Sequence, residues 1–358
     1  MTLNLERHLA TAYWHLIAHR AELAAPGDYL RLDWPLGELV LFNDEGNIVA
    51  FDNICPHRGA RLFVEDCGSG RAICPYHGWS LRGGKVRPAR AELFEPAVLA
   101  GARLNAYRTQ WCGDFLFVGV EPQAALDAQL GEMTATLEAI SRQIAGRRDF
   151  NAFSFESSWR VAVENALESY HVASVHGATL ASFAMTDEQD AFIGPNCSYQ
   201  ARIGAGRTER GLKALKRFFD IDFQVEGYLA LHVFPFAMIS STFGYSYSLQ
   251  TFLPSREAGR THFASRLLAS RTAPGCEPVA QPLFDSAAKM NRQIFEEDHA
   301  ICRRVSPLYD LDAPDRIFGA NEERAKRFWL TLRRINETQG AAAPSARPPL
   351  RVASGANS

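Results

Sequence analysis

The sequence lacks long uninterrupted apolar runs and any marked excess of charge of one sign. No apolar run approaches the roughly 18–20 residues that a helix needs to cross a bilayer, and the stretch 1–22 carries charged residues that a secretion signal would not contain. The net charge of −2 gives no reason to expect nucleic acid or an anionic membrane as a partner. These absences predict a cytoplasmic protein.

A disulfide framework and a glycine-rich dinucleotide loop are missing as well. The cysteines number seven and are irregularly spaced, which indicates reduced thiols rather than a set of disulfides. Because no Gly-rich loop follows an expected strand, the chain is not expected to bind NAD(P)H or flavin itself. If the protein carries out redox chemistry, its electrons should come from a separate protein.

The length and the local patterns predict a two-part α+β chain. Its 358 residues suffice for two domains, since single hydrophobic cores tend to stop growing beyond about 250–300 residues. Short strands separated by turns begin with an expected hairpin over 38–51, helical spacing follows after residue 124, and aromatic and β-branched residues over 227–253 predict further strands. The expected divisions are a small all-β domain, 37–120, inserted into a larger domain formed by 1–36 and 121–340, and a disordered tail, 341–358.

Two Cys-and-His pairs occupy expected loops of the small β domain. Cys55 and His57 have the spacing Cys-x-His, and Cys74 and His77 have the spacing Cys-x-x-His. Zinc also accepts two thiolates and two imidazoles, but such zinc sites usually separate the cysteines by about two to four residues and keep the histidines together. One Cys and one His in each loop suit a two-iron cluster whose thiolates hold one iron and whose imidazoles hold the other. The pattern therefore favours a [2Fe–2S] cluster over zinc.

A second set of candidate ligands lies in the stretch 158–176, where His171 and His176 follow Glu164 and Glu168. Two histidines and one carboxylate on one face of iron are the arrangement of non-haem Fe(II) oxygenases. On a straight α-helix a spacing of five turns the second side chain about 140° away from the first. Both histidines can therefore bind one metal only if the helix bulges or ends between them. Two unrelated histidines are the alternative interpretation.

The third ligand is expected on an amphipathic helix over 285–305. On a wheel of 100° per residue, Asp298 falls within the apolar stripe, Glu297 at its edge and Glu296 on the opposite face. An unpaired carboxylate on a buried stripe is costly, and metal coordination removes that cost. Asp298 is thus the predicted ligand, and Glu297 is the second choice.

Together these motifs resemble those of the Rieske-type non-haem iron oxygenases, the aromatic ring-hydroxylating oxygenase alpha-subunit family. Ala60 and Tyr76 stand where respiratory Rieske proteins carry two further cysteines, so the resemblance is to the oxygenase and ferredoxin branch. It implies a Rieske domain inserted into a helix-grip-like catalytic domain with an antiparallel sheet. The implied [2Fe–2S] ligands are Cys55, His57, Cys74 and His77, and the implied ligands of a mononuclear Fe(II) that uses O2 are His171, His176 and Asp298.

The resemblance also implies partners and roles. Glu168 corresponds to the carboxylate that links an iron-binding histidine to a Rieske histidine, His77, of the neighbouring subunit. Glu164 is the competing carboxylate, because it lies four residues before Glu168 on nearly the same helical face. From the sequence it is expected to pair structurally instead, for example with an arginine. A separate NAD(P)H-dependent reductase, with or without a ferredoxin, would supply electrons. The length favours a homotrimer without a small subunit.

The expected reaction is the mono- or dihydroxylation of an apolar, aromatic small molecule. The segment 218–252 is dense in aromatic residues, which suits such a ligand, although the same density fits an ordinary sheet core. Oxidative N- or O-demethylation is the alternative within the family. A Rieske electron-transfer protein and a zinc protein are the alternatives outside it.

Overall fold

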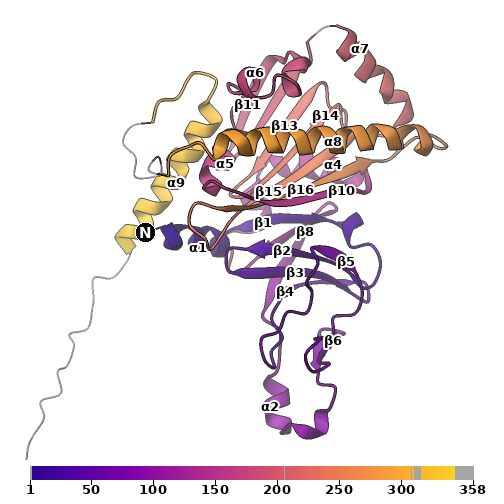
Figure 1. The fold of residues 1–358 in the computed structure, drawn as a ribbon, viewed down its shortest axis with the longest axis vertical. Helices are drawn as coiled ribbons and strands as arrows, with labels where there is room; N and C mark the ends of the chain where they lie inside the picture. The colour runs from indigo at the N-terminus through magenta and orange to yellow at the C-terminus, as the bar shows by residue number, and fades with distance from the viewer. Residues whose placement is uncertain (1, 205, 308, 310–315, 343–358) are drawn as a thin grey trace, which may run out of the picture.

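The computed structural model describes residues 2–204, 206–307, 309 and 316–342 (Figure 1). It consists of two antiparallel sheets, with helices concentrated around the second one. The described helices are α1 (Thr2–Ala12), α2 (Pro96–Gly101), α3 (Leu126–Leu130), α4 (Met133–Arg142), α5 (Trp159–Ala166), α6 (Val172–Val175), α7 (Arg207–Ala214), α8 (Glu277–Cys302) and α9 (Glu323–Ala342). Short 3-10 helices are η1 (Arg20–Glu22), η2 (Ala91–Leu93), η3 (Leu180–Phe183) and η4 (Leu215–Phe218).

The first sheet has the strand order β1-β9-β8-β4-β3-β2-β5, with every neighbouring pair antiparallel. Its strands are β1 (Trp14–His19), β2 (Asp28–Trp34), β3 (Gly37–Asp44), β4 (Asn47–Asp52), β5 (Cys67–Ser69), β8 (Ala106–Cys112) and β9 (Phe115–Gly119), and β6 (Ser80–Arg82) and β7 (Lys85–Arg87) form a separate hairpin. The hairpin expected over 38–51 is present as β3 and β4. The Asn43 side chain closes its turn by accepting a 2.7 Å hydrogen bond from the backbone N–H of Gly46.

The second sheet has the strand order β10-β16-β15-β14-β13-β12-β11 and is also antiparallel throughout. Its strands are β10 (Ile144–Phe155), β11 (Thr186–Ile193), β12 (Asn196–Arg202), β13 (Tyr228–Val233), β14 (Ala237–Thr242), β15 (Ser246–Pro254) and β16 (Thr261–Ser270). The long helix α8 lies across this sheet (Figure 1). The α+β fold class and the antiparallel sheet expected from the sequence are both present.

Alternation along β13 to β15 divides the second sheet into two faces, since successive side chains of a strand point to opposite sides. The odd-numbered residues Leu229, Leu231, Ile239 and Leu249 pack in one core with residues of α3 and α4. The even-numbered residues point to the other face, which α8 covers, and several of them are small or polar. The covered face therefore offers space that large apolar side chains would have filled.

The first sheet begins earlier in the chain than the expected domain boundary at residue 37. Strands β1 and β2 hydrogen-bond to β9 and β3, so residues 14–34 pack with the small β unit. We propose 14–119 as the extent of this unit. Of the tail expected to be disordered, residues 343–358 lie outside the described residues, whereas 341 and 342 belong to α9.

In the described part of the chain, no helix combines the length needed to cross a bilayer with a sufficiently apolar composition.

Candidate active site

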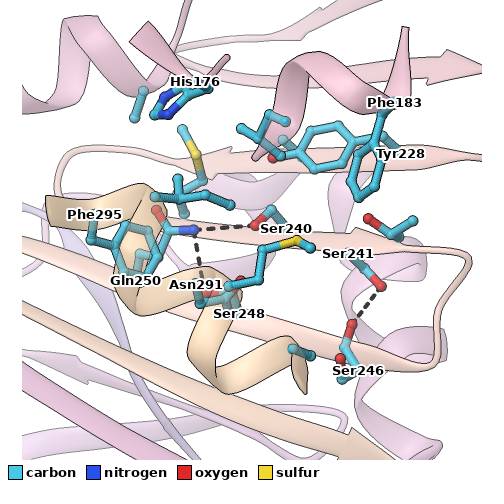
Figure 2. Close-up of a pocket in the computed structure, with 18 of the residues that line it drawn as sticks. His176, Phe183, Tyr228, Ser240, Ser241, Ser246, Ser248, Gln250, Asn291 and Phe295 are labelled. Atoms are coloured by element: carbon cyan, nitrogen blue, oxygen red, sulfur yellow. Dashed lines mark hydrogen bonds between the residues drawn. The ribbon is translucent and has the colours of Figure 1, made fainter. Parts of the chain in front are cut away.

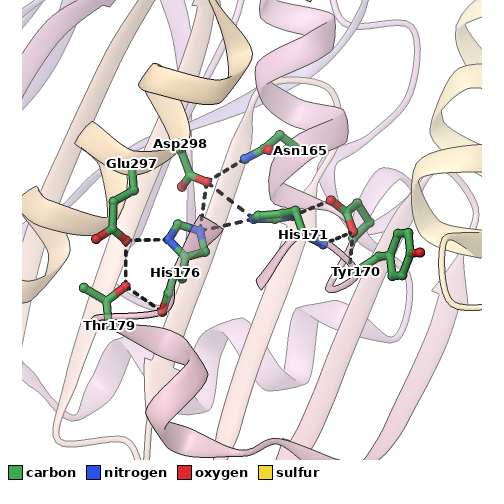
Figure 3. Close-up of polar contacts among 8 residues, drawn as sticks. Asn165, Tyr170, His171, His176, Thr179, Glu297 and Asp298 are labelled. Carbon is green, nitrogen blue, oxygen red and sulfur yellow. Dashed lines mark hydrogen bonds and ion pairs between the residues drawn. The ribbon is translucent and has the colours of Figure 1, made fainter. Parts of the chain in front are cut away.

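A break in the helix closes the gap between His171 and His176. Helix α5 begins after Ser158, whose side chain accepts a hydrogen bond from the backbone N–H of Arg160, and it ends at Ala166. The separate single turn α6 has His171 at its N-cap and His176 at its C-cap. The Nε2 atoms of the two histidines lie 3.2 Å apart (Figure 3). Helix α6 ends at Val175, between the two histidines, and the backbone of His176 is no longer helical, which satisfies the condition derived from the spacing.

Asp298, on α8, completes this group. Its Oδ1 lies 3.0 Å from Nε2 of His176 and 3.5 Å from Nε2 of His171, and one ligand atom from each residue falls within 4.8 Å of the others. The Nδ1 atoms of the two rings are occupied on the far sides by the carboxylates of Glu168 and Glu297. When each Nδ1 carries the proton that its carboxylate accepts, both Nε2 lone pairs face each other and a third acceptor. This arrangement fits a metal cation bound by two imidazoles and one carboxylate.

The pKa values of His171 and Asp298 also indicate a site that favours a bound cation. Burial lowers the pKa of His171, but its hydrogen bonds to Asp298 and Glu168 outweigh burial and raise the pKa to about 9. Burial raises the pKa of Asp298, but hydrogen bonds to His171 and His176 outweigh it and lower the pKa to about 2. Without a metal, protons on the imidazoles therefore neutralise the cluster of acceptors.

Glu297, the second choice as ligand, lies behind His176 rather than among the three converging atoms. Its Oε2 is 2.7 Å from Nδ1 of His176 and accepts a 2.7 Å hydrogen bond from the Thr179 hydroxyl (Figure 3). The Gln293 amide donates to Oε1 at 3.0 Å. Asn165 similarly donates a 2.7 Å hydrogen bond to Oδ1 of Asp298. These contacts fix the orientation of two of the three candidate ligands.

Sequence reasoning missed three of these supporting residues. Asn165 and Thr179 carry no local signal, because their contacts with α8 join segments more than a hundred residues apart. Gln293 could have been found, since it precedes Glu297 by four residues on one helix.

The expected pairing of Glu164 with an arginine is present: its carboxylate forms an ion pair with Arg316, whose side chain is 2% exposed.

Glu168 lies at the edge of the site. Its carboxylate contacts Nδ1 of His171 and accepts a 3.1 Å hydrogen bond from the backbone N–H of the same residue. The neighbouring Tyr170 is 72% exposed. The Glu168 side chain itself is 14% exposed, so its carboxylate lies between a candidate metal ligand and solvent.

The two Cys-and-His loops have matching backbone geometry. In the first loop, the Cys55 N–H donates to the carbonyl of Ala60 and the Cys55 carbonyl accepts from Gly59, at 2.8 and 2.9 Å. In the second loop, Cys74 makes the equivalent bonds with Trp79 and Gly78, at 2.6 and 3.0 Å. Gly59 and Gly78 both have positive φ, +73° and +70°, a conformation that glycine adopts without steric cost. The loops are thus related copies of one local structure.

The side chains of these loops fit a cluster with two thiolate and two imidazole ligands. The Cys55 and Cys74 thiols are free, buried and in contact with each other, and burial followed by the proximity of Cys74 raises the pKa of Cys55. The rings of His57 and His77 have centroids 4.6 Å apart. Nδ1 of His57 is buried and has no hydrogen-bond partner among the described residues. A metal bound at this ring would give that orphaned nitrogen a partner.

A cavity of about 310 Å³ extends from the His171, His176 and Asp298 group along α8. The second sheet forms its floor, and α7, η3 and η4 contribute apolar side chains. Of the aromatic residues in 218–252, Phe219, Tyr228 and Tyr245 line this cavity. Phe236 instead lies in the core against Trp159, at a centroid distance of 5.0 Å, so it does not shape the cavity wall.

Two family models match the chain. The Rieske [2Fe-2S] domain matches residues 13–95, and the ring hydroxylating alpha subunit (catalytic domain) matches residues 147–337. The two matched segments contain, respectively, both Cys-and-His loops and all three residues of the histidine and aspartate group.

The similar curated proteins are oxygenase subunits. The glycine betaine monooxygenase oxygenase subunit of Chromohalobacter salexigens is 30% identical over 186 residues, covering 49% of this chain and 41% of that protein. The carnitine monooxygenase oxygenase subunit of Acinetobacter pittii is 30% identical over 173 residues, or 46% of each chain. The 2-halobenzoate 1,2-dioxygenase large subunit of Burkholderia cepacia is 26% identical over 49% of this chain and 40% of its own length. The chain thus spans about half the length of the curated relatives that it matches.

Solved structures share the fold. A quaternary ammonium Rieske monooxygenase in complex with an inhibitor aligns with a TM-score of 0.75, 17% identity, and coverage of 93% of this chain and 91% of that one. Naphthalene 1,2-dioxygenase from Rhodococcus sp. bound to indole aligns with a TM-score of 0.68 at the same identity and coverage. At this identity the likeness concerns the fold alone.

Proposed function

The chain belongs to the Rieske-type ring-hydroxylating oxygenases, and from this premise we propose that it is the terminal oxygenase component of a multicomponent enzyme. In this role it uses O2 and electrons from a separate reductase or ferredoxin to oxygenate a small organic molecule. The observation that carries the proposal is the position of the cavity. It ends directly at His171, His176 and Asp298, so a bound molecule has one end beside the candidate iron site.

Family membership implies a [2Fe–2S] cluster and a mononuclear iron, which when bound supply electron transfer and the activation of O2. We assign the cluster to Cys55, His57, Cys74 and His77, and the iron to His171, His176 and Asp298. Asn165 and Glu297 hold two iron ligands in position through the hydrogen bonds described above. Apolar side chains around the cavity keep water away from the reacting end of the substrate.

Electron delivery is proposed to occur between subunits. The first sheet, whose loops carry the Cys-and-His pairs, and the α6–α8 region lie in different parts of the chain (Figure 1). Within the proposed head-to-tail homotrimer, His77 of one subunit would approach Glu168 of its neighbour. Two exposed side chains support such a contact: Tyr76, adjacent to His77, and Tyr170, two residues after Glu168. Glu168 then positions His171 and joins the two centres.

We propose a small, largely apolar substrate, with hydroxylation as the reaction. The apolar walls of the cavity, including Phe183, Phe219 and Phe284, support this choice. Oxidation of a quaternary ammonium compound, with loss of an N-methyl group as one form of it, is the second candidate. The names of the glycine betaine and carnitine monooxygenase subunits favour it, and aromatic rings can attract such cations.

The test is a substrate panel with the iron-loaded protein and a generic reductase, scored by mass spectrometry for oxygen from labelled O2. The panel includes small aromatic compounds, glycine betaine and carnitine. Incorporation of labelled oxygen into any product, dependent on Asp298, supports a terminal oxygenase. NADH consumption or electron acceptance without labelled product from any compound, by a protein with a full complement of iron, would instead indicate an electron-transfer protein.

A further inference from the structure

A strip of neutral polar side chains runs along the cavity floor, where the fold would accept apolar ones. Ser240 on β14 pairs directly with Ser248 on β15, and Met238 pairs with Gln250 one rung away. All four line the cavity (Figure 2). Because the strip lies on two central strands of the sheet, its members are held on rigid backbone.

The strip is connected by hydrogen bonds that leave some of its capacity unused. The Gln250 amide donates to the hydroxyls of Ser240 and Ser248 at 3.1 and 3.4 Å (Figure 2). The Ser248 hydroxyl also contacts that of Ser265 at 3.1 Å. Among the described residues no donor bonds to the carbonyl oxygen Oε1 of Gln250. Gln250 is 94% buried, since its relative exposure is 6%. Because Gln250 lines the cavity and its Oε1 is not among the fully enclosed atoms that lack a partner, a ligand in the cavity can donate a hydrogen bond to this oxygen.

Asn291 faces the strip from α8, on the opposite wall (Figure 2). Its side-chain amide has no hydrogen-bond partner in the described part of the chain, although its neighbours on the same helix face, Phe284 and Phe295, are buried and apolar. An amide offers both a donor and an acceptor. The cavity therefore presents unused neutral donors and acceptors on two facing walls.

The charged groups that line the cavity are already engaged elsewhere. Besides the histidines, the charged lining residues of the described chain are Glu168, Asp298 and Arg324. Glu168 contacts His171, and Asp298 belongs to the candidate iron site. Arg324 lies 2.9 Å from Asp190 and stacks over the Tyr199 ring at 4.0 Å. A charged group of a ligand would thus find no uncommitted counter-charge.

We propose that Ser240, Ser248, Gln250 and Asn291 form a neutral hydrogen-bonding subsite, so that the substrate combines an apolar body with an uncharged polar group such as an amide or a hydroxyl. This inference rests on the proposed function and names the substrate class for the same cavity. The subsite orients the substrate by its polar group, and the end beside the iron site is the one that reacts. Ser241 is not part of it, because its hydroxyl closes the β14–β15 turn through Ser246 and Gly244.

Binding to the iron-loaded full-length protein under anaerobic conditions tests the subsite without requiring turnover. Four ring compounds of similar size serve as probes: benzamide, ethylbenzene, benzoate and benzyltrimethylammonium. Calorimetric titration is expected to give the lowest Kd for benzamide, about tenfold below those of the two ions. Asn291→Leu should raise the Kd for benzamide about fivefold to tenfold, the value of one hydrogen bond, and leave that for ethylbenzene within about twofold. Asn291→Asp should reverse the preference towards benzyltrimethylammonium.

Gln281→Leu is the matched control, because Gln281 is an exposed amide on the same helix and, among the residues that the structure describes, bonds to Asp285 alone. It should leave all four Kd values unchanged. The subsite is overturned if the unaltered protein binds benzoate or benzyltrimethylammonium more tightly than benzamide. It is also overturned if Asn291→Leu and Gln281→Leu lose the same amount of affinity for benzamide. Incorporation of labelled oxygen is measured separately. The expected order of Kd values without any oxygenated product would contradict the proposed function. Oxygenation of a charged probe alone would contradict only the subsite.

Discussion

Nδ1 of His176 lies 2.7 Å from the Glu297 carboxylate, on the side of the ring opposite the nitrogen that faces Asp298. The carboxylate thereby sets which nitrogen carries the proton and which one is free for a metal. Glu168 has the same relationship with His171. Both candidate imidazole ligands of this site therefore have a carboxylate behind them.

Removing the carboxylate behind His176 should weaken iron binding. Glu297→Ala is expected to raise the Kd for Fe(II) about tenfold to a hundredfold, the usual effect of losing a hydrogen-bonded partner of a metal ligand. Glu297→Gln keeps an acceptor for Nδ1 of His176 and should lose less Fe(II) affinity. Anaerobic Fe(II) titration of protein freed of its mononuclear iron measures both. Glu296→Ala, on the solvent side of the same helix, is the control. An equal loss of Fe(II) affinity in this variant would contradict the role assigned to Glu297.

Changing Glu168 should separate metal binding from turnover. Because Glu168 also holds His171, Glu168→Ala should bind Fe(II) more weakly, as Glu297→Ala does. Supplied with enough Fe(II) to fill both iron centres, the variant is expected to lose nearly all product formation, because in the proposed relay this carboxylate joins His171 to the electrons of the neighbouring subunit. Iron and sulfide content, together with product formed per reductase-supplied electron, distinguish the two effects. Full activity in this variant would rule out the relay role, and loss of the mononuclear iron would show that Glu168 acts only by orienting His171.

Iron affinity should rise with pH. Because the pKa of His171 is raised to about 9 in the metal-free cluster, this ring carries a proton at pH 7 that iron must displace. Between pH 6.5 and about 9 the apparent Kd for Fe(II) should fall about tenfold per pH unit, the slope for one released proton. Calorimetry in buffers of different ionisation enthalpy counts the proton directly. A Kd independent of pH across this range would contradict the protonation state described here.

The ion pair between Glu164 and Arg316 should contribute to stability rather than to chemistry. The Arg316 side chain is 2% exposed, so Glu164→Gln leaves a buried cation without its partner charge. We expect a loss of about 3 kcal/mol in the free energy of unfolding by urea. Glu45→Gln, in the exposed pair with Arg82, should cost less than about 1 kcal/mol. Equal losses in the two variants would show that burial of the pair is unimportant.

Much of the candidate site could be predicted from sequence because its signals are local. The Cys-and-His spacings, the His171 and His176 pair and the periodicity that singled out Asp298 over Glu296 are all read within one segment. The structure brings His171, His176 and Asp298 to one point, and it shows a helix end between the two histidines, at Val175, as the spacing of five required. The hairpin over 38–51 was equally local, with turn residues between two apolar stretches.

The remaining features depend on packing between distant segments. Asn165 and Thr179 become relevant only when α8 is placed beside them. Membership of β1 in the first sheet depends on its pairing with β9, which lies far along the chain. The polar strip was also hidden, because Ser240, Ser248 and Gln250 look like the solvent-facing residues of half-exposed strands. Their burial follows from α8 covering that face.

Metal analysis of the anaerobically purified protein tests most directly whether the chain holds two separate iron centres. Two centres of different nuclearity in one chain predict about three irons and about two acid-labile sulfides per polypeptide. Cys74→Ser should leave about one iron and no sulfide, and Asp298→Ala should leave about two irons and both sulfides, with an EPR signal after reduction. Zinc in place of iron, or loss of all iron in the Asp298 variant while the protein remains folded, would contradict two separate iron centres.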